Sequence, residues 1–183
     1  MKRYTIAILI TLVLVSGVLM GCSEGLQTFS KYGISLTVSK ELKLEEYTVS
    51  VEDQIFRRGI SSYEEGAVIS TEKNFMLLWV TAVPEYTQEE IRDSIISTPN
   101  TFESAGSNLQ AEITSSISTQ QIAGFEISFA DMLFIMPGWE ASGITAVWNC
   151  PANHRTIQLI LIHNSPQSEM NRFIRSFSCD SIN

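Results

Sequence analysis

The sequence contains few of the side chains on which enzyme and metal sites depend. Its 183 residues include two histidines, His154 and His163, whose spacing fits no common metal site. No Gly-x-Ser-x-Gly elbow, His-Glu-x-x-His motif, phosphate-binding loop or dinucleotide fingerprint is present. We interpret His154 as a surface turn residue and His163 as a strand-end cap. We therefore expect no catalytic residue, no metal site and no cofactor.

Basic residues are also scarce, with 12 Lys and Arg against 20 Asp and Glu. Two of the basic residues, Lys2 and Arg3, lie within residues 1–21, so 10 basic and 20 acidic residues remain after this segment, a net charge of −10. Nucleic-acid binding depends on cations that neutralise phosphates, so this balance argues against a nucleic-acid partner. It equally disfavours electrostatic docking onto anionic lipid.

The first 22 residues have the pattern of a secretory signal peptide. After Lys2 and Arg3, the 16 residues from Thr5 to Met20 carry no charge, and Leu19-Met20-Gly21-Cys22 follow. These last four residues resemble the lipobox of prokaryotic lipoproteins. The resemblance implies cleavage between Gly21 and Cys22, with thioether lipidation of Cys22. An uncleaved membrane anchor is the alternative, although 16 apolar residues fall short of the ~20 that span a bilayer.

This interpretation divides the chain into a signal peptide (1–21), a lipidated tether (22–28) and a single α+β domain (29–183). Removal of 21 of the 183 residues leaves 162, a usual size for one domain. We expect the protein at the cell membrane, attached through Cys22 and facing the periplasm or the cell exterior.

The two remaining cysteines, Cys150 and Cys179, form an even pair in an oxidising compartment, and a disulfide bond is the simplest interpretation. A loop of about 30 residues closed in this way stabilises by roughly 3–4 kcal/mol in the chain-entropy model. Two buried free thiols are the alternative. Cysteines this far apart, without clustered histidines, make a poor zinc site.

Hydrophobic periodicity predicts a largely antiparallel sheet with two main helices packed on it. The strands are expected at 32–38, 47–56, 67–71, 75–83, 111–118, 125–136, 144–150 and 156–163, with a loop at 40–46. The capping box of Thr87 and Glu90 starts a helix that should run to about residue 97. Pro99 then breaks or kinks it, and residues 101–107 are expected to form a second turn or two. A second amphipathic helix is expected to start with Ser165 as its cap and Pro166 at its first position. In 125–136 the apolar residues switch from odd to even positions at 130–131. This switch indicates a β-bulge or a strand covered on both faces.

The order of these elements resembles the PsbP-like fold, which is also seen in bacterial DcrB-type lipoproteins. The resemblance rests on Tyr32-Gly33-Ile34-Ser35-Leu36 in the first strand, a long apolar strand that leads into a helix, and a closing helix that ends in Ser176-Phe177. It implies an α-β-α sandwich with a curved antiparallel sheet, in proteins that mostly bind other proteins rather than catalyse.

Three aromatic residues, Trp139, Tyr63 and Tyr86, are expected near strand ends, where aromatic side chains are enriched in contact surfaces. Alternatively, Trp139 covers one end of the core. The favoured function is a membrane-anchored, non-catalytic protein-binding or accessory module. The alternatives are a small extracytoplasmic hydrolase that uses His154 or His163 with a nearby carboxylate, and a solute-binding lipoprotein.

The disulfide interpretation has a direct test. Mass spectrometry of peptides digested under non-reducing conditions should recover a cross-linked peptide that contains both Cys150 and Cys179. Recovery of both residues as free thiols would contradict the pairing.

Overall fold

A computed structural model describes residues 25–31, 33–40, 43–49, 64–70, 75–82, 85–104 and 109–180. Cys22, Tyr63 and the expected strand residues 50–56 lie outside these ranges. The elements are β1 (Leu26–Lys31), β2 (Ile34–Ser39), β3 (Lys43–Val49), β4 (Glu64–Ser70), β5 (Phe75–Ala82), α2 (Gln88–Ser104), β6 (Gln110–Ile113), β7 (Ser118–Ile122), β8 (Phe125–Met136), β9 (Trp139–Cys150), β10 (Arg155–Ile162), α3 (Pro166–Ser176) and β11 (Ser178–Cys179).

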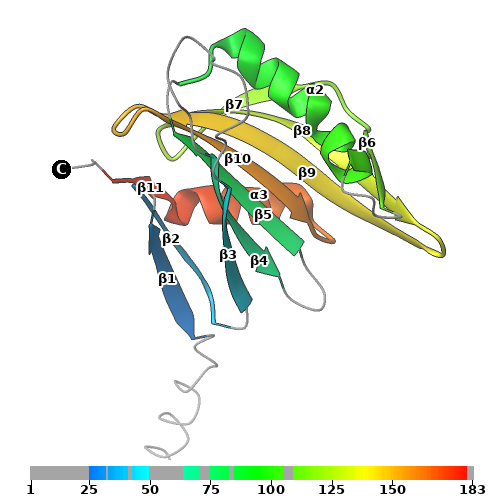
Figure 1. The fold of residues 1–183 in the computed structure, drawn as a ribbon, viewed down its shortest axis with the longest axis horizontal. Coiled ribbons are helices and arrows are strands. Elements are labelled where there is room, and N and C mark those ends of the chain that lie inside the picture. The colour runs from blue at the N-terminus through cyan, green and yellow to red at the C-terminus, as the bar shows by residue number, and fades with distance from the viewer. Residues whose placement is uncertain are drawn as a thin grey trace, which may run out of the picture.

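The strands form two antiparallel sheets. The large sheet has the order β3-β4-β5-β10-β9-β8-β6, with β7 also paired to β8, and the small sheet has the order β1-β2-β11. Helix α2 lies on one side of the large sheet, whereas α3 and the small sheet lie on the other (Figure 1). The expected α+β class, with an antiparallel sheet and two helices packed on it, is therefore confirmed. Neither of these two helices is long and apolar enough to cross a membrane.

The central strands of the large sheet are apolar on both faces. In β9, Ile144, Ala146 and Trp148 belong to the core on the α3 side, whereas Val147 joins Ile91 and Ile95 of α2 on the opposite side. β10 alternates in the same way between the two cores. This double coverage explains why these segments read as apolar runs rather than as simple alternation.

Strand β8 contains no bulge against β9, because its pairing is continuous from Ser128 to Met136. The switch of the apolar positions at 130–131 instead marks the point where β8 passes from the core on the α3 side to the core on the α2 side. Ile127 and Phe129 belong to the core on the α3 side, and Met132 and Phe134 to a core cluster on the α2 side. The alternative of a strand covered on both faces is therefore correct.

The irregularity lies in the neighbouring segment, where a single strand over 111–118 was expected. β6 and β7 both pair with β8, but the four residues 114–117 between them oppose only two residues of β8. Thr114 donates its N–H to the Asp131 carbonyl, and the Ser115 hydroxyl accepts the Asp131 N–H, each at 2.9 Å. A side chain thus replaces one backbone partner where the ladder is interrupted.

Helix α2 begins as expected and ends later than expected. The Thr87 N–H donates to the Glu90 carboxylate at 2.8 Å, and the Glu90 N–H donates to the Thr87 hydroxyl at 3.3 Å, which completes the capping box. Pro99 neither ends the helix nor separates it into two, because α2 continues to Ser104. Tertiary packing holds this last part, since the Phe102 ring meets Phe134 edge-on at 5.3 Å.

Helix α3 begins at Pro166, and its buried stripe of Met170, Phe173 and Ile174 faces the sheet as expected. The expected cap by the Ser165 side chain is absent. Instead, the Ser165 N–H donates to Nδ1 of His163 at 2.9 Å, so the imidazole supports the helix start. Phe177 ends the stripe and packs edge-on against Trp148, with ring centroids 5.2 Å apart.

Two segments expected to lack regular structure are strands. β1 begins at Leu26, inside the expected tether, and β3 occupies most of the loop expected at 40–46. Both are at sheet edges, so neither shows a long apolar run. The pairing of β1 with β2 runs from Leu26–Ser39 to Lys31–Ile34, which buries Phe29 against the core.

The disulfide bond between Cys150 and Cys179 joins the large sheet to β11, and the two Cα atoms are 5.8 Å apart. The Asn153 amide strengthens this junction, because it donates to the carbonyls of Gly33 and Asp180. The Asp180 N–H also donates to the Gly33 carbonyl, at 2.8 Å. The end of β9, the start of β2 and the residues after β11 are therefore fixed together.

Close packing around Gly143 of β9 generates a stability prediction. A Cβ at this position would lie 2.7 Å from the Leu161 carbonyl oxygen and would collide with the Phe134 ring. Since the backbone oxygen cannot move aside, Gly143→Ala should lower the free energy of unfolding by about 1–3 kcal/mol in urea denaturation. The neighbouring exposed Ser142→Ala is the control, with an expected change within about 0.5 kcal/mol. Equal stability of the two variants would show that the sheet relaxes at this point.

Candidate functional site

Trp139 lies at the tip of the β8–β9 hairpin, which projects at the right of Figure 1. Pro137-Gly138 forms the turn, and the positive φ of 77° at Gly138 suits the third position of a type II turn. Met136 and Trp139 pair directly across the hairpin and are 39% and 42% exposed. The tip therefore presents two large apolar side chains next to each other, and Trp139 does not serve as a buried cover of the core.

Tyr86 does not share this surface. Its backbone is bonded to Asn149, which lies ten positions from Trp139 along β9, about 33 Å at the usual strand rise. The side chain is half-buried against the core cluster of Ile91, Ile95, Ala130 and Val147. Trp139 and Tyr86 therefore lie at separate places on the molecule, and a partner contact at either residue stays a prediction. Tyr63 lies outside the described residues.

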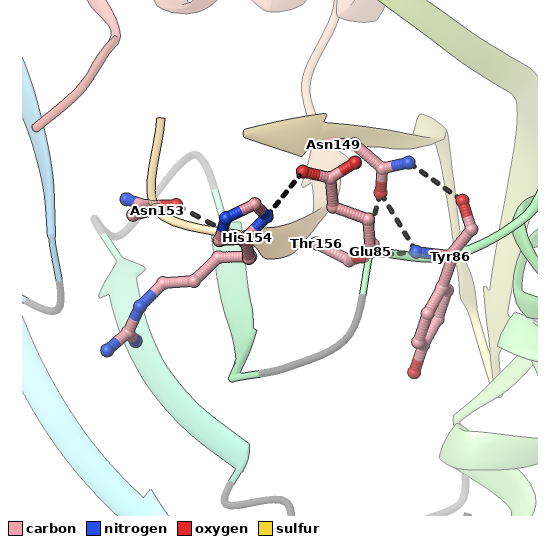
Figure 2. A network of polar contacts seen from close by, with 7 residues as sticks. Glu85, Tyr86, Asn149, Asn153, His154 and Thr156 are labelled. Carbon is pink, nitrogen blue, oxygen red and sulfur yellow. Dashed lines mark hydrogen bonds and ion pairs between the residues drawn. The ribbon is translucent and has the colours of Figure 1, made fainter. Parts of the chain in front are cut away.

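A polar network surrounds the backbone of Tyr86 at the end of the large sheet (Figure 2). Its N–H donates to the Asn149 Oδ1 at 3.2 Å and to the Thr156 hydroxyl at 3.0 Å. The Asn149 Nδ2 donates to the Tyr86 carbonyl at 2.7 Å, and the Thr156 hydroxyl donates to the Asn149 Oδ1 at 2.8 Å. This closed set of bonds fixes the segment that leads into α2.

The same region contains the histidine that the hydrolase hypothesis requires. His154 lies in the β9–β10 turn with a positive φ of 55°, and its Nδ1 is 3.2 Å from a carboxylate oxygen of Glu85 (Figure 2). Both side chains are accessible, with relative exposures of 76% and 34%. In the part of the chain that the structure describes, no serine, threonine or cysteine side chain is hydrogen bonded to His154 or to His163. The pair has the geometry of a surface ion pair, without a nucleophile held by a base.

Over the described ranges, no group of three His, Cys, Asp or Glu residues converges in a way that could hold a metal ion. The two cysteines of these ranges are joined to each other.

The layers, sheet order and closing helix together define a PsbP-like α+β sandwich. The solution structure of cyanobacterial PsbP (CyanoP) from Synechocystis sp. PCC 6803 superposes with a TM-score of 0.57 at 13% sequence identity, over 87% of this chain and 95% of that one. No protein-family model matches the sequence, and no curated protein matches it either. The similarity therefore concerns the fold.

For both the hairpin tip and the network around Tyr86, the sequence predicted one residue but not the residues that lie next to it in the fold. Trp139 was identified from its position after Pro137-Gly138, whereas Met136 was assigned to a strand, and its exposure follows only from the hairpin turn. Asn149 and Thr156 carry no local sign that they bind Tyr86, which is 63 and 70 positions away. The coupling of residues 149 and 156 follows from the pairing of β9 with β10.

The network around Tyr86 predicts a structural role for Asn149. Asn149→Ala removes both hydrogen bonds to the Tyr86 backbone and the acceptor of Thr156, so we expect a loss of about 1–3 kcal/mol in the free energy of unfolding. Glu85→Gln, which affects only the exposed contact with His154, should change it by less than about 0.5 kcal/mol. Thermal or urea unfolding measures both variants. A larger loss for Glu85→Gln would assign the stabilising role to the ion pair instead.

Proposed function

We propose that this protein is a membrane-anchored extracytoplasmic lipoprotein that acts as a non-catalytic accessory module and binds a protein partner through the tip of its β8–β9 hairpin. The lipid on Cys22 would hold the domain at the membrane surface. This attachment raises the effective concentration for a partner at the same membrane.

The observation that carries the proposal is the exposure of Met136 and Trp139 at a turn fixed by Pro137-Gly138. Most of a protein's large apolar side chains are buried, and Trp and Met are enriched in protein interfaces. A tight two-residue turn presents the two side chains with little loss of conformational entropy on binding. The tip therefore has the composition and the rigidity of an interface anchor.

The roles of the two histidines support the non-catalytic part of the proposal. His163 supports the start of α3, and His154 forms an exposed contact with Glu85. A general base has to be positioned against a nucleophile or a substrate proton. Neither imidazole has such a neighbour among the described side chains.

The proposal predicts the behaviour of a tip variant in co-purification from native membranes. The full-length wild-type chain should recover one partner reproducibly, and Trp139→Ala should lower its recovery by about tenfold, as expected for the loss of an aromatic anchor. The matched control is Ile96→Ala, which truncates another exposed apolar side chain, 52% accessible, on α2. It should leave recovery unchanged.

Three outcomes would contradict parts of the proposal. Equal recovery with Trp139→Ala and with the wild type would remove the tip from the interface. A measurable hydrolysis by the wild type that His154→Ala abolishes would favour an enzyme. Cys22→Ala should release the chain from the membrane fraction, and retention of this variant would overturn the lipid anchor.

A further inference from the structure

The large sheet has an open edge at β7 (Ser118–Ile122). β7 pairs with β8 on one side, and no strand within the described ranges pairs with its other side. Ser118, Thr119, Gln120 and Gln121 are all exposed, so both faces of this strand are also accessible. An open strand edge presents unpaired backbone groups that can accept a further strand.

The hairpin turn determines which backbone groups point outward. Ala123 and Gly124 have positive φ values of 51° and 90°, as in a type I′ turn. In such a two-residue hairpin, the pair next to the turn, Ile122 and Phe125, is hydrogen bonded, and bonded pairs then alternate along the ladder. Thr119 and Gln121 therefore direct their N–H and C=O groups away from β8. None of these four groups has a hydrogen-bond partner in the part of the chain that the structure describes.

The sequence of β7 lacks the features that protect an edge. Proteins block edge strands with charged residues, especially Lys, and with Pro. Ser-Thr-Gln-Gln-Ile contains neither, and the whole stretch from Ile113 to Ile122 is free of charge, Pro and Gly. By contrast, β3 at the other edge of the sheet contains Lys43, Glu45 and Glu46. Within the large sheet, β3 and β6 thus carry charge, whereas β7 lacks this protection.

The strands beside this edge carry charge of one sign, whereas α3, which packs near β7, contains Arg172 and Arg175. No Lys or Arg occurs between Arg92 and Arg155, whereas β6, β8 and β9 contain Glu112, Glu126, Asp131 and Glu140. Glu112 and Glu126 are exposed and lie beside the two ends of the interrupted edge. Complementary charge selects partners and accelerates their encounter, so this environment favours a basic segment.

We infer that the β7 edge binds an extended, Lys- or Arg-containing segment of another protein, which adds as a further strand to the large sheet. This mode of recognition takes affinity from main-chain hydrogen bonds and specificity from the flanking side chains. The inference rests on the proposed protein-binding function and supplies the chemistry of the partner.

A second copy of this chain fits the edge less well. Pairing of two copies through β7 would bring together the exposed Glu112 and Glu126 of both copies. A paired strand of five residues is about 17 Å long and buries far less than the 1,200 Å² or so of a stable interface. A basic segment avoids the charge repulsion, and its contacts can extend beyond the five residues of β7 along β6.

The edge is also continuous with the hairpin tip. β6 lies on the same side of β8 as β7, and its first residue, Gln110, is paired with Ile135, directly before Met136. A segment that leaves β7 along β6 would therefore arrive beside the tip. One partner can therefore contact both the β7 edge and the hairpin tip, so the two sites are tested separately.

The test uses the full-length protein in detergent micelles and a nine-residue probe peptide of alternating Lys and Thr. Amide hydrogen exchange should slow by about tenfold or more at Thr119 and Gln121 on addition of this peptide. The already bonded amide of Gln120 should change little. A peptide of alternating Glu and Thr, and a Lys peptide with Pro at alternate positions, should give no protection.

Charge reversal separates the edge from general attraction to an acidic protein. Glu112→Lys should weaken binding of the Lys-Thr peptide by about tenfold in fluorescence anisotropy, whereas Glu140→Lys, the same charge change beside the tip, should weaken it far less. Thr119→Pro, which removes an outward N–H but no bond to β8, should abolish binding. Its far-ultraviolet circular dichroism spectrum would show whether the variant folds, and the Glu112→Lys result is decisive if it does not.

Three outcomes would overturn the inference. These are protection absent from Thr119 and Gln121, equal weakening by the two charge reversals, and protection that rises with protein concentration without any peptide, which would indicate self-association. None of them affects the proposed function, which depends on Trp139→Ala in native membranes. Conversely, the peptide could bind at β7 while no partner is recovered from native membranes. This result would support the inference on the β7 edge and contradict the proposed function.

Discussion

The need to cover both faces of the strands β8, β9 and β10 determines the arrangement of all other elements. Side chains of these strands are buried alternately towards α2 and towards α3, so neither face can be left in water. Burial of each such side chain contributes roughly 1.5–3 kcal/mol, and a sheet with one uncovered face would lose about half of this. Helix α2 covers one face. Because α3 has only 11 residues, the small sheet completes the cover of the other.

The small sheet needs its own attachments, because three short strands bury too little surface to be stable alone. Phe29, Ile34, Leu36 and Val38 insert from it into the core shared with α3. The Cys150–Cys179 bond and the Asn153 amide then tie its last strand to the end of β9. A stabilisation of roughly 3–4 kcal/mol by the disulfide, in the chain-entropy model, is large relative to the total stability of a typical domain.

Local patterns predicted most features whose cause is local, with the absent Ser165 cap as the exception, and failed where the cause is a distant contact. The Thr87–Glu90 box and the stripe of Met170, Phe173 and Ile174 depend on neighbours within one or two turns, and both occur as expected. The persistence of α2 beyond Pro99 depends on Phe102 against Phe134, and β1 and β3 depend on pairing rather than on periodicity. In the candidate site, Trp139 was found from its turn. The contacts of Tyr86 were not predicted, because its aromatic character said nothing of Asn149, on a strand that reaches it only in the folded chain.

The pairing within the small sheet also gives the domain a polarity. Leu26 of β1 is opposite Ser39, at one end of β2, whereas Cys179 of β11 is opposite Ile34, at the other end. Five residues of strand separate these two positions, about 17 Å, and β2 lies between the two strands. The chain thus enters the domain at one end of this sheet and leaves it at the opposite end, as the start of β1 and the label C show in Figure 1. If the entry end is held at a surface, a module fused to the carboxyl end points away from that surface, so the fold acts as a spacer with a defined orientation.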